Sequence, residues 1–187
     1  MEEVKRNSLQ AWILAARPKT LTGAITPVMI GTALAAMDGR FHWLPALICC
    51  LFASLMQIAA NFINDLSYNG WGDVLVIVFF GFVPVGGTYY VQALTWTPDV
   101  TIASLICGLL IDTLLVVNNY RDREADARSG KRTVIVRFGE KFGRYFYLML
   151  GITASLLCLC FLREGHFYAA FLPQLYLIPH FLTWKRM

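Results

Sequence analysis

The sequence has few charged residues, and it contains none of the usual motifs for binding nucleotides or transition metals. Only 15% of the 187 residues are charged, which is too few for the surface of a soluble domain of this length. Neither a P-loop nor a G-x-G-x-x-G sequence is present, which argues against a nucleotide site. The three histidines are scattered and no two cysteines form a C-x-x-C pair, which argues against zinc and haem.

Hydrophobic residues are abundant instead, at 57% of the chain with a mean hydropathy of +0.56. They form long blocks, each close to the roughly 20 residues with which a helix spans a bilayer. We therefore predict an all-α, polytopic membrane bundle of about six transmembrane helices, folded as a single domain over residues 1–187. The blocks are Leu21–Met37, Leu44–Ile63, Val74–Leu94, Val100–Val117, Tyr145–Leu162 and Phe167–Thr183.

The basic residues are distributed unevenly between the two sides of such a bundle. With six helices and both termini in the cytoplasm, 14 of the 16 Lys and Arg residues are cytoplasmic, and only Arg40 and Arg163 are outside. This is the positive-inside pattern. We expect a multi-pass protein of the cell's inner (plasma) membrane, in contact with the lipid bilayer and without a nucleic-acid partner.

A cluster of polar and charged residues follows the block Val100–Val117. Asn119, Asp122 and Asp126 have the spacing i, i+3, i+7, so they share one face if the helix continues. Two carboxylates one turn apart suit Mg²⁺, whose shell substrate phosphates commonly complete. Lys131 and Arg132 follow closely and can bind phosphate themselves. This pattern predicts a Mg²⁺ site for a lipid diphosphate at the membrane surface.

A second polar cluster lies at the end of the block Leu44–Ile63. Asn61 and Asp65 are four residues apart, and the six-helix topology places them on the same side of the membrane as Asp122. We interpret them as a second edge of the metal site, since Asn and Asp supply the oxygen ligands that Mg²⁺ prefers. The alternative is a polar helix end that only caps itself in water.

Asp112 is the anomaly inside the apolar blocks. It precedes Asn119 by seven residues and so points to the same helix face. A carboxylate within the membrane is costly and normally faces a partner or a wet cavity. One interpretation is a polar contact with Thr113 or Thr88, and another is the intramembrane proton site of a small transporter.

Three further features bear on a substrate site. Tyr120 adjoins the aspartates, where an aromatic face would stabilise an allylic cation, although aromatic residues also form interfacial belts. Arg17 and Lys19 can bind an acidic aromatic substrate, or can merely set the topology. Glycine and proline recur within Gly81–Gly87, which indicates close helix packing or a broken helix lining a cavity.

On these motifs the chain resembles the UbiA superfamily of intramembrane aromatic prenyltransferases, and within it the branch that acts on 1,4-dihydroxy-2-naphthoate. The family's later motif, N-x-x-D-x-x-x-D, is intact as Asn119, Asp122 and Asp126. The surrounding residues 118–122 and 130–139 favour this branch over the ubiquinone and haem o branches. Arg17-Pro18-Lys19-Thr20 and the stretch Gly81–Gln92 also match its pattern.

Two departures from the family pattern stand out. In the first motif, N-x-x-x-D-x-x-x-D, Asn61 and Asp65 match, but Asn69 occupies the position of the last aspartate. Members of the family resemble bundles of eight or nine helices, whereas this chain contains six apolar blocks. We expect that a segment of about two helices is missing between Ser67 and Tyr68.

The resemblance implies a Mg²⁺-dependent transferase that moves a polyprenyl or phytyl group from a prenyl diphosphate to 1,4-dihydroxy-2-naphthoate in menaquinone or phylloquinone synthesis. Asp65, Asp122 and Asp126 would hold the metal ion and act as the catalytic carboxylates. The alternative is a catalytically impaired remnant that binds prenyl lipid or a partner, and oligomerisation is left open. The expected substrate-binding residues are Asn61, Asn119, Arg121, Lys131, Arg132, Arg17, Lys19 and Tyr120.

Overall fold

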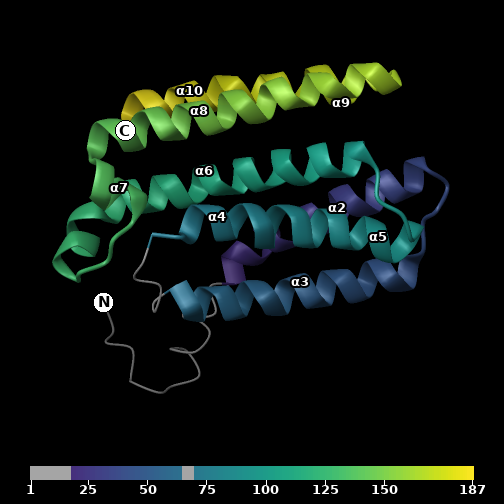
Figure 1. Cartoon of the computed structure of the whole chain (residues 1–187), viewed down its shortest axis with the longest axis horizontal. Helices are drawn as coiled ribbons and strands as arrows, with labels where there is room; N and C mark the ends of the chain where they lie inside the picture. The colour runs from purple at the N-terminus through teal and green to yellow at the C-terminus, as the bar shows by residue number, and fades with distance from the viewer. Residues whose placement is uncertain (1–17, 65–69) are drawn as a thin grey trace.

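The structure is a computed structural model that describes the backbone of residues 18–64 and 70–187. It describes their side chains as well, except at Pro18 and residues 59–64. Within these residues all regular secondary structure is helical, so the prediction of an all-α bundle is confirmed. The helices run roughly parallel to one long axis (Figure 1).

The described helices form six rods and one short connecting helix. α2 (Leu21–Met37), preceded by the 3₁₀ turn η1 (Pro18–Thr20), and α3 (Trp43–Asn64) are the first two. α4 (Gly72–Val76), the π-helix η2 (Ile77–Gly86) and α5 (Gly87–Ala93) form a continuous third, here called the α4–α5 rod. The fourth rod is α6 (Pro98–Arg128), and the fifth is α8 (Glu140–Cys158) with η3 (Leu159–Glu164). The sixth consists of α9 (Phe167–Phe171), η4 (Leu172–Tyr176) and α10 (Leu177–Arg186). α7 (Val134–Phe138) is the short helix that connects α6 to α8.

The long central helix α6 has clear start and stop signals. Thr97 accepts a hydrogen bond from the Val100 backbone N–H at 3.3 Å, and Pro98 occupies the first turn, a position that proline favours. The helix ends at Arg128, and Gly130 follows with a φ of +78°, which glycine adopts without strain. The helix therefore continues past Val117, as a shared face for Asn119, Asp122 and Asp126 requires.

Glycines bring the α4–α5 rod unusually close to α6. A Cβ added to Gly81 would lie 2.5 Å from the Ser104 carbonyl oxygen, and one added to Gly108 would lie 2.9 Å from Ile77 Cα. Only glycine permits this backbone approach, which is typical of helix packing in membranes. The predicted close packing in this segment is therefore confirmed, and it coincides with a π-helix rather than a break.

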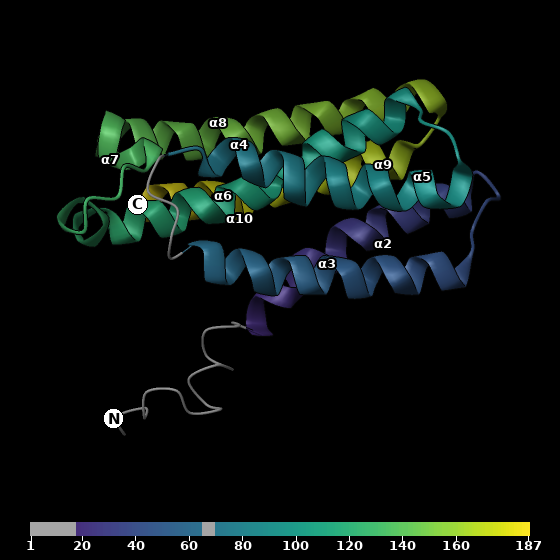
Figure 2. The same cartoon turned by 60° about the horizontal axis from the view of Figure 1, so that its bottom comes forward.

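The main core lies between α6 and α8. Buried residues of α6, among them Val116, pack with Tyr147, Leu150 and Ala154 of α8. α10 packs in turn on α8, and both helices run along the long axis of the bundle (Figures 1 and 2). The bundle is thus organised around α6, which contacts the α4–α5 rod on one side and α8 on another.

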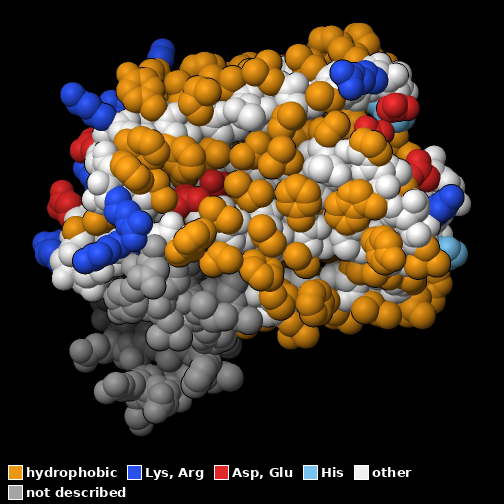
Figure 3. All heavy atoms as spheres, in the orientation of Figure 1, with side chains coloured by type: hydrophobic (Ala, Val, Ile, Leu, Met, Phe, Trp, Pro, Cys, Tyr) orange, Lys and Arg blue, Asp and Glu red, His pale blue; other side chains and the backbone are white. Residues whose placement is uncertain are grey.

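The outer surface is that of a membrane protein. Hydrophobic side chains form a broad band between two ends that carry most of the charge (Figure 3). Within the described residues, three helices are long and apolar enough to cross a membrane: Gly72–Ala93, Pro98–Arg128 and Glu140–Glu164. The apolar helices Leu21–Met37 and Trp43–Ile58 are shorter. The sequence predicted about six membrane spans. The described residues form six rods, and three of these have the length and composition of a membrane span.

Candidate functional site

The predicted site residues of α6 and of the loop that follows it lie at one end of the bundle. This end contains the last turn of α3, the start of α4, the end of α6, all of α7 and the start of α8 (Figure 1). Lys and Arg side chains cluster at the same end in the space-filling view (Figure 3). The topology therefore brings the end of α3 and the end of α6, which are distant in sequence, to the same end of the bundle.

Asp122 and Asp126 lie one turn apart near the end of α6 and are both partly exposed. Arg121 donates two hydrogen bonds to the Asp122 carboxylate, both at 2.8 Å. Asp126 pairs with Lys131, whose Nζ lies 3.8 Å from a carboxylate oxygen. The acidic and basic groups expected to bind metal and phosphate are thus in contact with one another along one edge of the helix.

Asn119 lies on the same face, where it borders a small polar cavity of about 30 Å³. Lys131 and Thr133 reach the cavity from the loop before α7, and Asp73 reaches it from the first turn of α4. This volume is sufficient for a water molecule. The cavity links the second aspartate motif to the α4–α5 rod.

Asp73 was missed by the sequence analysis. It is buried, at 8% exposure, and sits at the site only because the chain bends sharply before α4. Gly70 permits this bend with a φ of +74°, and its Cα is so close to the loop that a Cβ would meet the Arg132 carbonyl oxygen at 2.5 Å. The sequence signal that could have identified Asp73 is the run Gly-Trp-Gly-Asp just before an apolar block.

Tyr120 is placed differently from its predicted role. Its side chain is buried between α6 and α8, and its hydroxyl donates to the Glu140 carboxylate at 2.6 Å. Arg123 covers the ring at 4.7 Å and pairs with Glu140 at 3.3 Å. This arrangement anchors α6 to α8, so Tyr120 turns away from the face that carries Asp122.

The other predicted site residues are divided between described and undescribed parts of the chain. Arg132 is exposed in the loop before α7, and Lys19 is exposed in η1. Asp65 and Arg17 lie outside the described residues, as does the side chain of Asn61. Their participation in the site remains a prediction.

A divalent cation fits part of this arrangement. Asp122 and Asp126 offer carboxylate oxygens one turn apart and Asn119 offers an amide oxygen on the same face, which is the donor chemistry of Mg²⁺. The described residues contain no group of three or more His, Cys, Asp or Glu side chains placed to hold a metal ion. A site confined to those residues would therefore depend on substrate oxygens or water to complete its shell.

Asp112 lies deeper along the same face of α6 and is fully buried. Neither carboxylate oxygen has a hydrogen-bond partner among the described residues. The expected contact with Thr113 or Thr88 is not formed, because the Thr113 hydroxyl donates to the Leu110 carbonyl instead, at 2.6 Å. A carboxyl group in this environment is costly to ionise.

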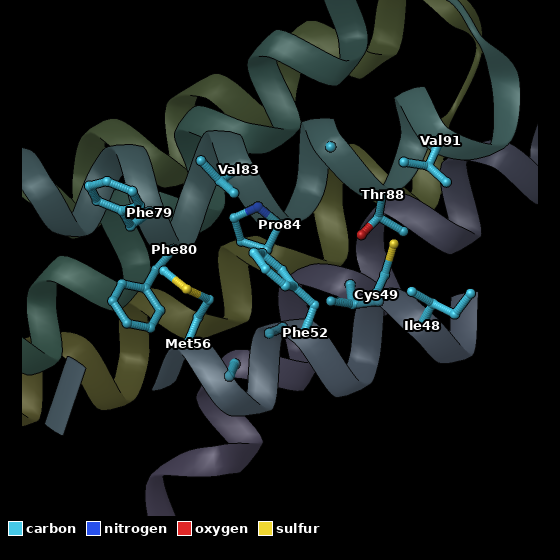
Figure 4. Close-up of a pocket in the computed structure, with 14 residues that line it drawn as sticks. Ile48, Cys49, Phe52, Met56, Phe79, Phe80, Val83, Pro84, Thr88 and Val91 are labelled. Carbon is cyan, nitrogen blue, oxygen red and sulfur yellow. The ribbon is translucent and has the colours of Figure 1, made fainter. Parts of the chain in front are cut away.

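An apolar cavity of about 310 Å³ lies between α2, α3 and the α4–α5 rod. Figure 4 shows Phe52 and Met56 of α3 facing Phe80 and Pro84 of η2 across it. Nearly all of its lining is hydrophobic, so it suits a hydrocarbon chain. The cavity borders the glycine- and proline-rich segment, but that segment is a continuous helix and not the broken helix of the alternative prediction.

Comparisons with known proteins agree with the sequence motifs. Residues 66–187 match the UbiA prenyltransferase family. The 1,4-dihydroxy-2-naphthoate octaprenyltransferase of Escherichia coli is 28% identical over 241 aligned positions, covering 85% of this chain and 78% of that protein. The protein of the same name from Haemophilus influenzae is 35% identical over 133 positions, covering 71% of this chain and 42% of that protein. No solved structure matches.

A third relative, the 2-carboxy-1,4-naphthoquinone phytyltransferase of Synechocystis, is 28% identical over 78 positions, covering 42% of this chain and 25% of that protein. The alignment with the E. coli protein is longer than the 187 residues of this chain, so that relative contains internal residues which this chain lacks. The expectation of a shortened chain is thereby confirmed, while the position of the gap stays a prediction. Because the family match covers well over half of its residues, the chain belongs to the UbiA prenyltransferase family.

Proposed function

We propose that this chain transfers a polyprenyl or phytyl group from a prenyl diphosphate to 1,4-dihydroxy-2-naphthoate, as a step of menaquinone or phylloquinone synthesis. The allylic C–O bond breaks with its electron pair going to the diphosphate. The ring carbon that bears the carboxylate then bonds to the allylic carbon, and the carboxylate leaves as CO₂. The names of the three relatives describe prenyl or phytyl transfer to naphthalene rings of this kind.

The observation that carries the proposal is the exposed edge of α6 formed by Asn119, Asp122, Asp126 and the nearby Lys131. A bound Mg²⁺ would neutralise the negative charge that develops on the departing diphosphate. Asp122, Asp126 and Asp65 would hold that ion. Lys131, Arg121 and Arg132 would bind the diphosphate oxygens directly.

The apolar cavity supplies a place for the prenyl tail, because nearly all of its lining is hydrophobic. The acidic acceptor would approach from the basic end of the bundle, and Arg17 and Lys19 are proposed to attract its carboxylate. We place this end in the cytoplasm and the protein in the inner membrane, on the positive-inside pattern of the sequence.

Prenyl transfer by the purified chain in lipid nanodiscs tests the proposal. The reaction would contain 1,4-dihydroxy-2-naphthoate, a prenyl diphosphate and Mg²⁺, with a parallel reaction in excess chelator. We expect a prenylated, decarboxylated product that disappears when the metal ion is removed. Folded protein that forms no product under any condition would contradict the proposal and favour a remnant that binds lipid without turnover.

A further inference from the structure

The small polar cavity beside Asn119 contains an acid and a base that form no direct ion pair with each other. Among the described residues that line this cavity, Asp73 is the only acid and Lys131 is the only base. Asp73 is 8% exposed, and it forms no ion pair within the described part of the chain. A buried carboxylate without a counter-charge is costly, so a cation on the far side of the cavity stabilises it.

The position of Asp73 in a helix does not account for its burial. Asp73 is the second residue of α4, where the helix dipole favours an acid. Asp99 is the second residue of α6 and has the same benefit, yet its side chain is only partly buried. The helix dipole therefore explains an acid at this position, but it does not explain why Asp73 faces a closed cavity beside a lysine.

Close backbone contacts hold the two sides of the cavity together. A Cβ on Gly70, in the bend before α4, would lie 2.5 Å from the Arg132 carbonyl oxygen. Arg132 follows Lys131 directly, and the next residue, Thr133, begins α7 by accepting a hydrogen bond from the Val136 backbone N–H at 3.3 Å. The loop that carries the lysine is thus fixed against the bend that carries the aspartate.

The cavity has the size and polarity of a site for one water molecule. Its volume is about 30 Å³, and four polar side chains border it, those of Asp73, Asn119, Lys131 and Thr133. A buried water needs about this space and two to four polar partners. One water can accept a hydrogen bond from Lys131 and donate one to Asp73. A divalent cation fits this space less well, because the ammonium group beside it would repel the ion.

Lys131 is shared between two acids. Its Nζ lies 3.8 Å from a carboxylate oxygen of Asp126, which is about 1 Å longer than a close pair between these groups. The two side chains are 28% and 14% exposed, so solvent screens their charges only in part. Lys131 therefore lies between Asp126 and Asp73 without a close pair to either, and a phosphate can bind it at little cost.

We propose that Asp73 is a positioning residue for Lys131. Across the cavity, its charge draws the ammonium group away from Asp126. Lys131 then stays available for diphosphate oxygens, and Asp126 stays available for the metal ion. This inference rests on the proposed function, in which the two residues have these roles. Without the charge of Asp73, Lys131 pairs closely with Asp126, and a substrate must break that pair before it binds.

Binding of inorganic diphosphate in the presence of Mg²⁺ tests this role. It is measured on the full chain in nanodiscs by equilibrium dialysis, with empty nanodiscs subtracted. Asp73→Asn should weaken binding about fivefold, because the tightened pair must be broken. A charge that acted only at long range would have the opposite effect, since removing a negative charge favours an anion. The matched control is Asp99→Asn, which removes the same group from the second position of α6 and should change nothing.

A double-mutant cycle identifies the residue through which Asp73 acts. Lys131→Met alone should weaken diphosphate binding about tenfold, and adding Asp73→Asn to it should cause no further loss. A further fivefold loss in the Lys131→Met background would overturn the inference and would indicate that Asp73 binds the metal ion directly. Asp73→Ser, which also removes the charge, replaces Asp73→Asn in the cycle if the asparagine variant does not fold.

The inference is also overturned if folded Asp73→Asn binds diphosphate as tightly as the wild type or more tightly, or if the wild type binds none. Prenyl transfer is measured on the same samples to separate the two proposals. Coupling between Asp73 and Lys131 in protein that transfers no prenyl group would contradict the proposed function and leave the positioning role in a diphosphate site standing. Prenyl transfer without this coupling would contradict the positioning role alone.

Discussion

The two sides of α6 use polar residues in opposite ways. Towards α8, Tyr120 donates to Glu140 and Arg123 covers the tyrosine ring, so these three residues are paired with one another. On the other side a stripe of residues faces the α4–α5 rod and then continues beyond the start of that rod at Gly72. This stripe comprises Ser104, Gly108, Asp112, Leu115, Asn119, Asp122 and Asp126.

Hydrogen bonding along this stripe is incomplete. The Ser104 hydroxyl and both Asp112 oxygens lack a hydrogen-bond partner within the described part of the chain. Asp122 pairs with Arg121 and Asp126 pairs with Lys131. A phosphate-bearing substrate could also bind these two basic side chains. The comparison indicates that the paired residues towards α8 hold the fold together, whereas we propose that the other side, where it continues beyond Gly72, is arranged for a ligand.

Substitution at the ligand-binding side should give the largest effect. Lys131→Met removes the ammonium group paired with Asp126, which in the proposed reaction binds the diphosphate. We expect kcat for prenyl transfer to fall about 100-fold, in line with the loss of one charge-stabilising donor. The matched control is Lys141→Met, at an exposed lysine of α8, and an equal loss in both variants would contradict the assignment.

Gly81→Ala should have the next largest effect, this time on stability. The added methyl group would lie 2.5 Å from the Ser104 carbonyl oxygen and 3.0 Å from Gly108 Cα. We expect a cost of about 2 kcal/mol from overpacking, measured as a lower Tm in detergent. Gly87→Ala on the same rod meets nothing within 4 Å and should leave the Tm unchanged or raise it, so equal losses would refute the close contact.

Tyr120→Phe tests the side that faces α8. The variant loses the hydroxyl contacts with Glu140 and with the Met187 carbonyl oxygen but keeps the buried ring. We expect a lower Tm than that of the wild type, by less than the Gly81→Ala change, and the same kcat per folded molecule. A selective loss of kcat at unchanged Tm would instead indicate that Tyr120 contributes to the substrate site.

Asp112→Thr should give the smallest effect and the opposite sign. Threonine is close in size to aspartate, and its hydroxyl can bond the carbonyl one turn back. Removing an unpaired buried carboxyl group should raise the Tm slightly and leave prenyl transfer intact. Loss of transfer would favour a functional proton site at Asp112.

Much of the fold could be predicted from the sequence, because apolar blocks of bilayer length have few alternatives to helices. The continuation of α6 past Val117 was also indicated by the spacing of Asn119, Asp122 and Asp126. Asp73 was not found, because its position depends on a bend that packs Gly70 against Arg132. Tyr120 was misjudged since adjacent residues of a helix face different neighbours, which only the packing on α8 could reveal.

The most direct test of the account compares Asp122→Asn with Glu124→Gln. Both changes remove one negative charge from the same turn of α6, but Asp122 lies on the proposed ligand-binding stripe, whereas Glu124 is exposed elsewhere on the helix. The account predicts that prenyl transfer per folded molecule falls about 100-fold in Asp122→Asn and stays at the wild-type rate in Glu124→Gln. Equal activity in the two variants would contradict it.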